Sequence, residues 1–222
     1  MTIALGVLVS GSGSNLQAIL DRVREGSLDA DIRLVIANKQ GAQGLERARQ
    51  AGISTACVRH ADFPVRADFD RELVRLLRAA GVELVALAGF MRILTPEFLT
   101  PFAGRVVNIH PALLPACPGL GAQGQQADHG VRLAGCTVHF VDEEMDHGPI
   151  IIQAAVPAFA DDDEATLGAR ILEMEHRIYP QALQWIAQGR VQVSGRQVLV
   201  RDASRTMGAM WTNPPLETPF DL

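Results

Sequence analysis

The sequence predicts an α/β fold built on an open, mostly parallel sheet with helices on both faces and an antiparallel extension toward the C-terminus. Short, almost continuously apolar runs alternate with segments of helical period through the first half of the chain. Such runs are typical of parallel strands that are buried on both faces. Further apolar runs follow in the second half, and Val191–Val200 has the pattern of a hairpin with Ser194-Gly195 at its turn.

In the first half, each expected strand is an apolar run, and each expected helix repeats apolar residues every three or four positions. In the third helix, for example, Phe69, Leu73 and Leu77 follow this spacing. The order of elements is that of a Rossmann-like fold. In chain order, they are the strand Ile3–Val9, the helix Asn15–Arg24, the strand Ile32–Ala37, the helix Gly44–Ala51, the strand Ser54–Val58, the helix Asp68–Ala80, and the strands Leu84–Ala88 and Arg105–Ile109.

The second half has a different texture. Prolines and glycines predict an irregular loop over residues 111–119. Cys136–Val141 and Ile150–Val156 are expected strands, and Glu164–Ala187 is an expected long helix that Pro180 would kink or break. We expect a single domain over residues 1–200, with halves at about 1–105 and 106–200. A proline-containing tail over 201–222 is expected to be poorly ordered.

The composition excludes several classes of protein. The chain has 222 residues, 48% hydrophobic residues and a formal net charge of −5, so it can form a packed core and offers no basic surface for nucleic acid. Without a membrane-length apolar run or a signal peptide, it is expected to be cytoplasmic, with no membrane partner. Cys57, Cys117 and Cys136 lack C-x-x-C spacing, which argues against disulfides and a zinc site, so we expect no metal.

A glycine-rich turn, Ser10–Leu16, joins the first strand to the first helix. Its backbone N–H groups could form a phosphate cradle at the helix N-terminus. The alternative is an ordinary turn with Ser14 as the helix N-cap. A dinucleotide site is disfavoured, because Leu16 occupies the third glycine position and Asn38-Lys39 stands where an acidic residue would bind a ribose. No Gly-Lys-Ser/Thr follows, which excludes a Walker A loop.

The strongest candidate for chemistry is the segment Asn108-Ile109-His110-Pro111 at the end of an apolar run. Residues i and i+2 of a strand point to the same face, so the amide and the imidazole project side by side. Asp146, in an acidic loop, could orient and charge that imidazole. An amide, a histidine and a carboxylate can hold an oxyanion and move a proton, which suits acyl transfer without a covalent intermediate.

Each of these residues could instead have a purely structural role. Asn108 and His110 could be a satisfied amide and a core histidine, and the acidic loop could simply be solvated. Arg66 follows a loop and could cap the next helix or sit in solvent. Arg92 follows a strand and could lie near the rim where ligands of open α/β sheets bind.

Taken together, these motifs resemble the folate-dependent glycinamide ribonucleotide formyltransferases of purine synthesis. The resemblance covers residues 1 to 200 in order. The Asn-x-His-Pro segment is shared with other formyl-folate enzymes, whereas the Gly-Ser-Gly-Ser-Asn-Leu turn is more particular to this family. The matching segments are Ser10–Ala18, Leu87–Leu94, Asn108–Pro115, Gly135–Val141, Asp146–Gln153, and Glu175-His176 with Tyr179-Pro180.

The resemblance implies the formyltransferase fold and transfer of a formyl group from 10-formyltetrahydrofolate, a co-substrate, to the amine of 5'-phosphoribosylglycinamide. It also implies a phosphate-binding N-terminal half and a folate-binding, catalytic C-terminal half. Asn108, His110 and Asp146 would be catalytic. The ribonucleotide would contact Gly13, Ser14, Asn15, Leu172, Glu173, Met174 and Glu175. The folate would contact Arg66, Met91, Arg92, Ile93, Leu94, Asn108, Asp142, Glu143, Glu144, Met145 and Asp146.

Two positions depart from the family pattern. The family often has a histidine where Gln123 stands, in the flexible loop after Pro118-Gly119, and often a bulky residue where Cys117 stands. Gln123 therefore weakens any role for a second loop histidine. Neither change touches the Asn-His-Asp set.

Three other functions are compatible with parts of this pattern. A methionyl-tRNA formyltransferase would be expected to carry an additional tRNA-binding domain. A formyltetrahydrofolate deformylase would use water as acceptor and usually adds a regulatory domain. A non-catalytic nucleotide- or folate-binding module would not need the Asn-His-Asp combination. The chain is expected to act on small molecules as a monomer or homodimer.

Overall fold

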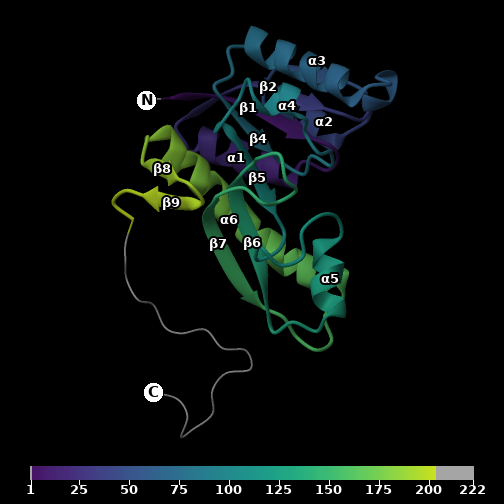
Figure 1. The fold of residues 1–222 in the computed structure, drawn as a ribbon, viewed down its shortest axis with the longest axis vertical. Helices are drawn as coiled ribbons and strands as arrows, with labels where there is room; N and C mark the ends of the chain where they lie inside the picture. Colours follow the sequence, from purple (N-terminus) through teal and green to yellow (C-terminus); the bar gives the residue numbers. More distant parts are fainter. Residues whose placement is uncertain (1, 204–222) are drawn as a thin grey trace, which may run out of the picture.

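The computed structural model describes residues 2–203, and most of the expected tail, from residue 204 onward, lies outside the described residues. Seven strands form one sheet in the order β3-β2-β1-β4-β5-β6-β7, and two more form a separate hairpin (Figure 1). Strands β1 to β5 pair in parallel, whereas β6 pairs antiparallel with both β5 and β7. The predicted parallel sheet with an antiparallel extension is therefore confirmed.

The elements largely follow the expected pattern, with boundaries shifted by a few residues. The strands are β1 Ile3–Val9, β2 Ala30–Ala37, β3 Thr55–Cys57, β4 Leu84–Leu87, β5 Val106–His110, β6 Leu133–Phe140, β7 Ile150–Pro157, β8 Val191–Ser194 and β9 Gln197–Val200. The helices are α1 Ser14–Arg24, α2 Gln43–Gln50, α3 Arg66–Ala79, α4 Pro96–Leu99, α5 Ala122–Asp128 and α6 Glu164–Ala187, with a 3₁₀ turn at His60–Asp62.

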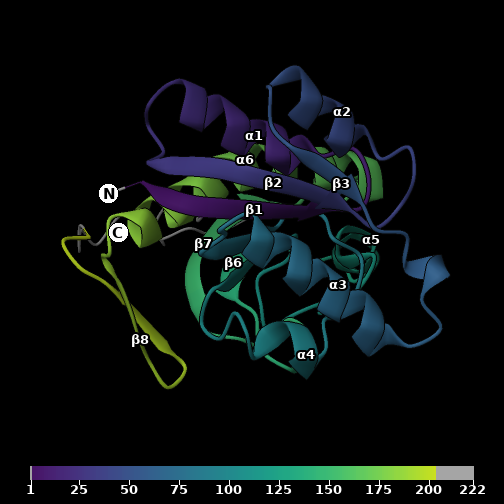
Figure 2. The same ribbon diagram turned by 90° about the horizontal axis from the view of Figure 1, so that it is seen from above.

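Helices cover both faces of the parallel strands (Figure 2). On one face, α1, α2 and α6 pack against alternate residues of β1, including Val7 and Val9. On the other face, α3 and α4 pack against Leu8 and its neighbours in adjacent strands. Because side chains alternate along a strand, a strand buried on both faces must be apolar at almost every position. This is the physical reason why the parallel strands can be predicted from the sequence.

The long helix α6 runs from Glu164 to Ala187 without a break, so the expectation that Pro180 could break it was wrong. Proline removes a hydrogen bond and costs a helix interior about 3 kcal/mol. Tertiary packing outweighs that cost here. Tyr179 is fully buried, and its hydroxyl donates toward the carbonyls of Leu87 and Val107, each at 3.0 Å, which ties the helix to β4 and β5.

Other local expectations also need correction. The turn of the hairpin is Gly195-Arg196 rather than Ser194-Gly195, because Ser194 pairs with Gln197. Gln123 lies in helix α5 rather than in an irregular loop. α5 was missed because it buries only Ala122 and Gln126, which gives it no apolar period. α4 was missed because it is a single turn.

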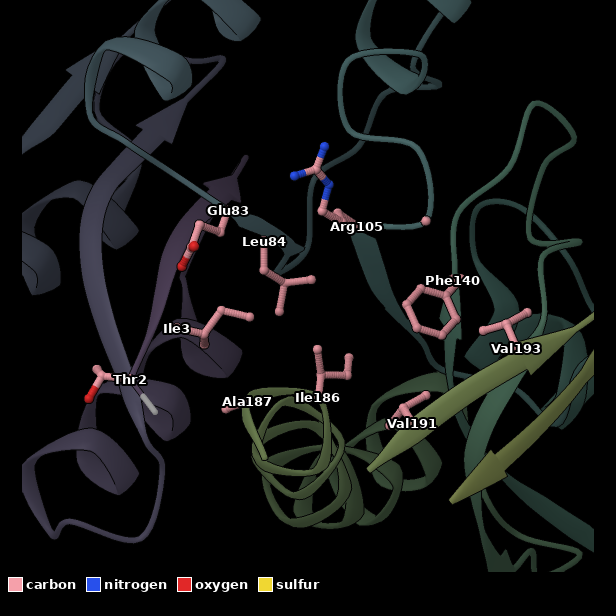
Figure 3. A pocket seen from close by; sticks show the side chains of 11 residues that line it. Thr2, Ile3, Glu83, Leu84, Arg105, Phe140, Ile186, Ala187, Val191 and Val193 are labelled. Carbon is pink, nitrogen blue, oxygen red and sulfur yellow. The ribbon is translucent and has the colours of Figure 1, made fainter. Parts of the chain in front are cut away.

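A cavity of about 480 Å³ lies where β1, β4 and β5 begin. Figure 3 shows Ile3 and Leu84 on one side and Val191 and Val193 of the hairpin on another. Arg105, which precedes β5, also lines this cavity. The root of the hairpin thus lies at the amino-terminal edge of the sheet. Among the described residues, no helix is long and apolar enough to cross a membrane.

Candidate active site

The opposite, carboxyl-terminal edge of the sheet gathers the predicted chemical residues. The strand order reverses between β1 and β4, and ligands of open α/β sheets bind outside the carboxyl ends of strands at such a point. Backbone and side chain join the two strand ends there. The Ser10 amide donates to the Gly89 carbonyl at 3.1 Å, and the Ser10 hydroxyl accepts from the Met91 amide at 2.9 Å.

Three predicted residues meet at this edge. Asn108 and His110 lie in β5, two positions apart, and Asp146 lies in the loop between β6 and β7. The Asp146 carboxylate lies 3.3 Å from His110 Nδ1 and 3.5 Å from Asn108 Nδ2. His110 is only 4% exposed, and water around the ring is correspondingly limited. The structure thus brings together the amide, the imidazole and the carboxylate that the sequence singled out.

Both ring nitrogens of His110 face hydrogen-bond acceptors. Nε2 lies 2.8 Å from the carbonyl oxygen of Cys117, and Nδ1 faces the Asp146 carboxylate. A carbonyl can only accept, so Nε2 carries a proton in this arrangement. A proton on Nδ1 as well satisfies both partners, so the geometry suits an imidazolium. Such a ring can donate a proton to a substrate and keep its counter-ion.

Asp146 is held in an unusual backbone conformation. Its φ of 52° lies in the left-handed region, which aspartate tolerates better than most residues. Gly119 donates its amide to the carboxylate at 2.8 Å. Gly148 is required nearby, because a Cβ there would lie 1.9 Å from the Phe140 carbonyl oxygen. The loop is therefore shaped by several independent contacts that aim one carboxylate at His110.

His139 is a member of this cluster to which sequence reasoning assigned no role. It pairs directly opposite Asn108 across β5 and β6, and its Nε2 lies 3.2 Å from Asn108 Nδ2 and 3.7 Å from Asp146. Burial lowers its pKa, with the nearby His110 adding to the effect. A neutral ring whose Nδ1 donates to the Phe140 carbonyl presents Nε2 as an acceptor for Asn108. His139 therefore orients the Asn108 amide, a role that depends on strand register.

The glycine-rich turn begins helix α1, as predicted, but Ser14 is not its N-cap. Gly13 occupies that position with φ of 68°, and Ser14 is the first helical residue. A Cβ on Gly13 would lie 2.6 Å from the Cα of Gly44. Glycine is thus needed for backbone conformation and for the close approach of α2. No side-chain hydrogen bond caps the start of α1 within the described residues, so its first N–H groups could bind an anion.

We expect Gly13→Ala to lower the free energy of unfolding by about 1–3 kcal/mol, because it combines left-handed strain with a backbone clash. Denaturant unfolding measures the change. Gly11→Ala is the matched control, since a Cβ there meets nothing within 4 Å among the described residues, and it should shift stability by less than about 0.5 kcal/mol. Equal effects at the two positions would contradict this account.

Asn15 and Glu175 meet although they are 160 positions apart. The Asn15 amide donates to the Glu175 carboxylate at 2.7 Å and joins α1 to α6. Both side chains are buried, and Asn15 Oδ1 has no hydrogen-bond partner within the described residues. Burial raises the pKa of Glu175, although the bond from Asn15 opposes this. Buried polar atoms without partners are uncommon, which makes the Asn15 oxygen a candidate contact for a polar ligand.

The rest of the predicted 172–175 segment is less constrained. Leu172 and Met174 are half-buried, and Glu173 is exposed. Met174 packs against the core beneath α6. Of the four residues, Glu175 is therefore the one that the structure aims at the glycine-rich turn.

Glu175→Gln is expected to preserve or raise the melting temperature at pH 7.5, because it removes a buried charge. A carboxyl whose pKa is higher in the folded state is neutral and harmless at low pH, and it destabilises the fold as pH rises from the unfolded pKa toward the folded one. The gain of the variant over the wild type should thus shrink on acidification toward pH 4. Thermal unfolding across pH tests this, and a variant that is less stable only at high pH would refute it.

The segment Met91–Leu94 also lies at the carboxyl edge. Met91 is 57% exposed and Ile93 is 49% exposed, whereas Leu94 is buried. Arg92 stacks over the Phe69 ring, with 5.2 Å to its centroid. The exposed side chains of Met91 and Ile93 offer an apolar contact surface for a ring system. The contacts of Arg92 with Phe69 and the burial of Leu94 hold the backbone of this segment in place.

A buried carboxylate supports that segment from α3. Asp70 accepts from the Thr95 amide at 2.7 Å, and burial raises its pKa, while Arg92 and Arg66 oppose this electrostatically. Arg66 follows a loop as the first residue of α3, and it is exposed to solvent. The loop after β6 mostly faces solvent. Asp142 is half-buried there, whereas Glu143, Glu144 and Met145 are exposed.

Comparison with known proteins decides the family. The formyl transferase family matches residues 3–183, which is most of the chain. The chain belongs to the formyl transferase family. The resemblance predicted from the motifs is thereby confirmed, and so is the fold class.

Relatives within the formyl transferase family agree over most of their length. The chain is 48% identical over 187 residues to phosphoribosylglycinamide formyltransferase of Escherichia coli, covering 84% of this chain and 88% of that one. A crystal structure of glycinamide ribonucleotide transformylase 1 from Symbiobacterium toebii is 52% identical with a TM-score of 0.88, covering 90% of this chain and 94% of that one.

A longer relative also matches. The chain is 50% identical over 192 residues to the trifunctional purine biosynthetic protein adenosine-3 of Drosophila melanogaster. The match covers 86% of this chain but only 14% of that protein. The formyl transferase unit thus occurs both in short bacterial enzymes and within much longer chains.

Proposed function

We propose that the protein transfers the formyl group of 10-formyltetrahydrofolate to the amine of 5'-phosphoribosylglycinamide, giving the N-formyl product and tetrahydrofolate in purine biosynthesis. The single observation that carries this proposal is the meeting of Asn108, His110 and Asp146 at the carboxyl edge of the sheet. The phosphoribosylglycinamide formyltransferase names of its bacterial relatives support the same reaction.

In the proposed reaction, the neutral amine attacks the formyl carbon and forms a tetrahedral oxyanion. The Asn108 amide has two hydrogens, of which one is engaged by His139 at 3.2 Å. The other makes only a 3.5 Å contact with Asp146, at the limit of a hydrogen bond, so it can turn to the oxyanion. His110, as imidazolium, then supplies a proton toward the departing folate nitrogen, and the C–N bond to the folate breaks. The attacking nitrogen, cationic in the adduct, gives up a proton that restores the imidazolium, so the net result moves one proton from the amine to the folate nitrogen.

We assign the ribonucleotide to the side of the site formed by α1 and α6. The N–H groups of Gly13, Ser14 and Asn15 would bind the phosphate. Glu175, next to the Asn15 oxygen that has no partner among the described residues, would accept from the amine or the ribose. Leu172, Glu173 and Met174 lie on the same helix turn.

We assign the folate to the opposite side. The exposed apolar surface around Met91 and Ile93 suits its ring system, and Arg66 offers a cation to its acidic end. The loop Asp142–Asp146 would complete this side. In the part of the chain that the structure describes, no group of three or more acidic, histidine or cysteine residues could hold a metal ion. A cytoplasmic location and a monomeric or homodimeric state stay predictions.

An absorbance assay of 10-formyltetrahydrofolate, with and without the ribonucleotide, tests this function. Loss of the formyl group that depends on the ribonucleotide is the expected result. Release of formate without the acceptor would instead show a hydrolase. Tight binding of either substrate without turnover would show a binding module, and the Asn-His-Asp assignment would then be wrong.

A further inference from the structure

The hairpin β8–β9 begins far from the candidate active site but reaches toward it. Val191 and Val198 pack against the core, and β9 contacts β7, whose preceding loop carries Asp146 (Figure 1). The two strands pair in register around a two-residue turn, Gly195-Arg196, in which Gly195 adopts a φ of 58°. The hairpin is thus anchored at its root and presents one arginine at its tip.

That arginine binds the residue next to Asp146. The Arg196 guanidinium donates from Nη2 to the carbonyl oxygen of His147 at 2.7 Å. Its Nη1 lies 2.7 Å from His147 Nε2 and 3.2 Å from Nδ1. The two guanidinium nitrogens therefore engage the backbone and the ring of one residue, 49 positions away in the sequence.

The ring of His147 also contacts Asp142, at the start of the loop that carries Asp146. Its Nδ1 lies 2.8 Å from the Asp142 carboxylate, which in turn accepts from the Glu144 amide at 3.1 Å. A carboxylate only accepts, so Nδ1 carries the proton and Nε2 offers its lone pair to Arg196. The neutral ring thus serves both charged partners. Asp142 and Arg196 are the charged groups that face it.

These contacts close the loop on both sides of Asp146. Asp142 is tied to His147, and His147 is tied to the hairpin, while Asp146 between them keeps its left-handed backbone. Left-handed φ is unfavourable for a residue other than glycine, so surrounding contacts must maintain it. Small displacements of a catalytic group are costly, because reaction rate depends steeply on geometry.

We propose that Arg196 is a positioning residue: from the tip of the C-terminal hairpin it braces, through His147, the loop that aims Asp146 at His110. Its kinetic part rests on the proposed function. Arg196 comes from a part of the chain beyond the residues matched by the family, which end at residue 183. The hairpin would therefore tune this site rather than supply its chemistry.

Arg196→Ala tests the brace by kinetics. We expect kcat to fall by roughly 10-fold to 100-fold and KM for the formyl-folate to rise, with KM for the ribonucleotide unchanged. Arg196→Lys should recover part of the loss, because an ammonium reaches one of the two acceptors but lacks the fork that binds both. Gln192→Ala, an exposed change in the same hairpin, is the matched control and should behave as the wild type.

Hydrogen exchange tests the brace independently of catalytic activity. The Gly119 amide donates to the Asp146 carboxylate, so its hydrogen exchange reports where Asp146 lies. Arg196→Ala should speed exchange at Gly119, and adding His147→Ala should add little, because both act on one link. Unchanged exchange and kinetics in Arg196→Ala would overturn the proposal, as would losses matched by Gln192→Ala. An inactive wild type would refute the proposed function alone, and the exchange result would still decide the brace.

Discussion

His110→Ala is expected to lower kcat by about 10²-fold to 10⁴-fold while the protein stays folded. The ring lies between the Cys117 carbonyl and the Asp146 carboxylate, where it can hold a proton and release it to a leaving nitrogen. Steady-state turnover of 10-formyltetrahydrofolate with the ribonucleotide measures the loss, and circular dichroism checks the fold.

Two further variants make this result interpretable. His110→Asn keeps a polar side chain in the buried site and should be as inactive as the alanine variant, which separates loss of the proton from loss of packing. His129→Ala removes an exposed histidine at the end of α5 and should keep normal turnover. Near-normal turnover in His110→Ala would remove His110 from catalysis.

Asp146→Asn is expected to lower kcat by on the order of 10²-fold or more, since an isosteric amide in a comparable histidine–carboxylate pair costs as much as 10⁴-fold. The amide keeps the shape and can still accept from Gly119, but it cannot neutralise an imidazolium. A protonated ring would lack its counter-ion in the variant, so proton transfer to the leaving nitrogen should be slower. The measurement is kcat for the wild type and the variant.

The control for this second prediction is Asp161→Asn, an exposed carboxylate after β7, which should leave turnover unchanged. Near-normal turnover in Asp146→Asn would mean that Asp146 only shapes the loop. That outcome would leave Asn108 and His110 in place but remove the proposed electrostatic role of the carboxylate.

Much of the fold was predictable because parallel strands that are buried on both faces appear in the sequence as continuous apolar runs. The run Ile3–Val9 is such a case, since Leu8 packs on one side while Val7 and Val9 pack on the other. The juxtaposition of Asn108 and His110 was predictable for a similar local reason, the two-residue period of a strand. Short helices without a periodic set of apolar residues, such as α5, have no comparable pattern in the sequence.

The contacts that complete the site were not predictable, because each depends on how distant segments pack. Asp146 reaches Asn108 across 38 positions, through the turn between β6 and β7. His139 faces Asn108 only because β5 and β6 pair in one register, and a slip of one residue would turn it to the other side of the sheet. Arg196 meets His147 only because the hairpin folds back beside β7.

The α/β class, the order of the strands along the chain, the family and the candidate catalytic residues could all be predicted from residue order, since they follow from local periodicity and motif. Only the folded chain shows which acceptors hold His110, that Gly13 must approach Gly44, that Asn15 meets Glu175 and that the C-terminal hairpin touches the catalytic loop. The physical reason is that propensity and periodicity act over a few residues, whereas these contacts are fixed by the packing of helices on a shared sheet and by strand register.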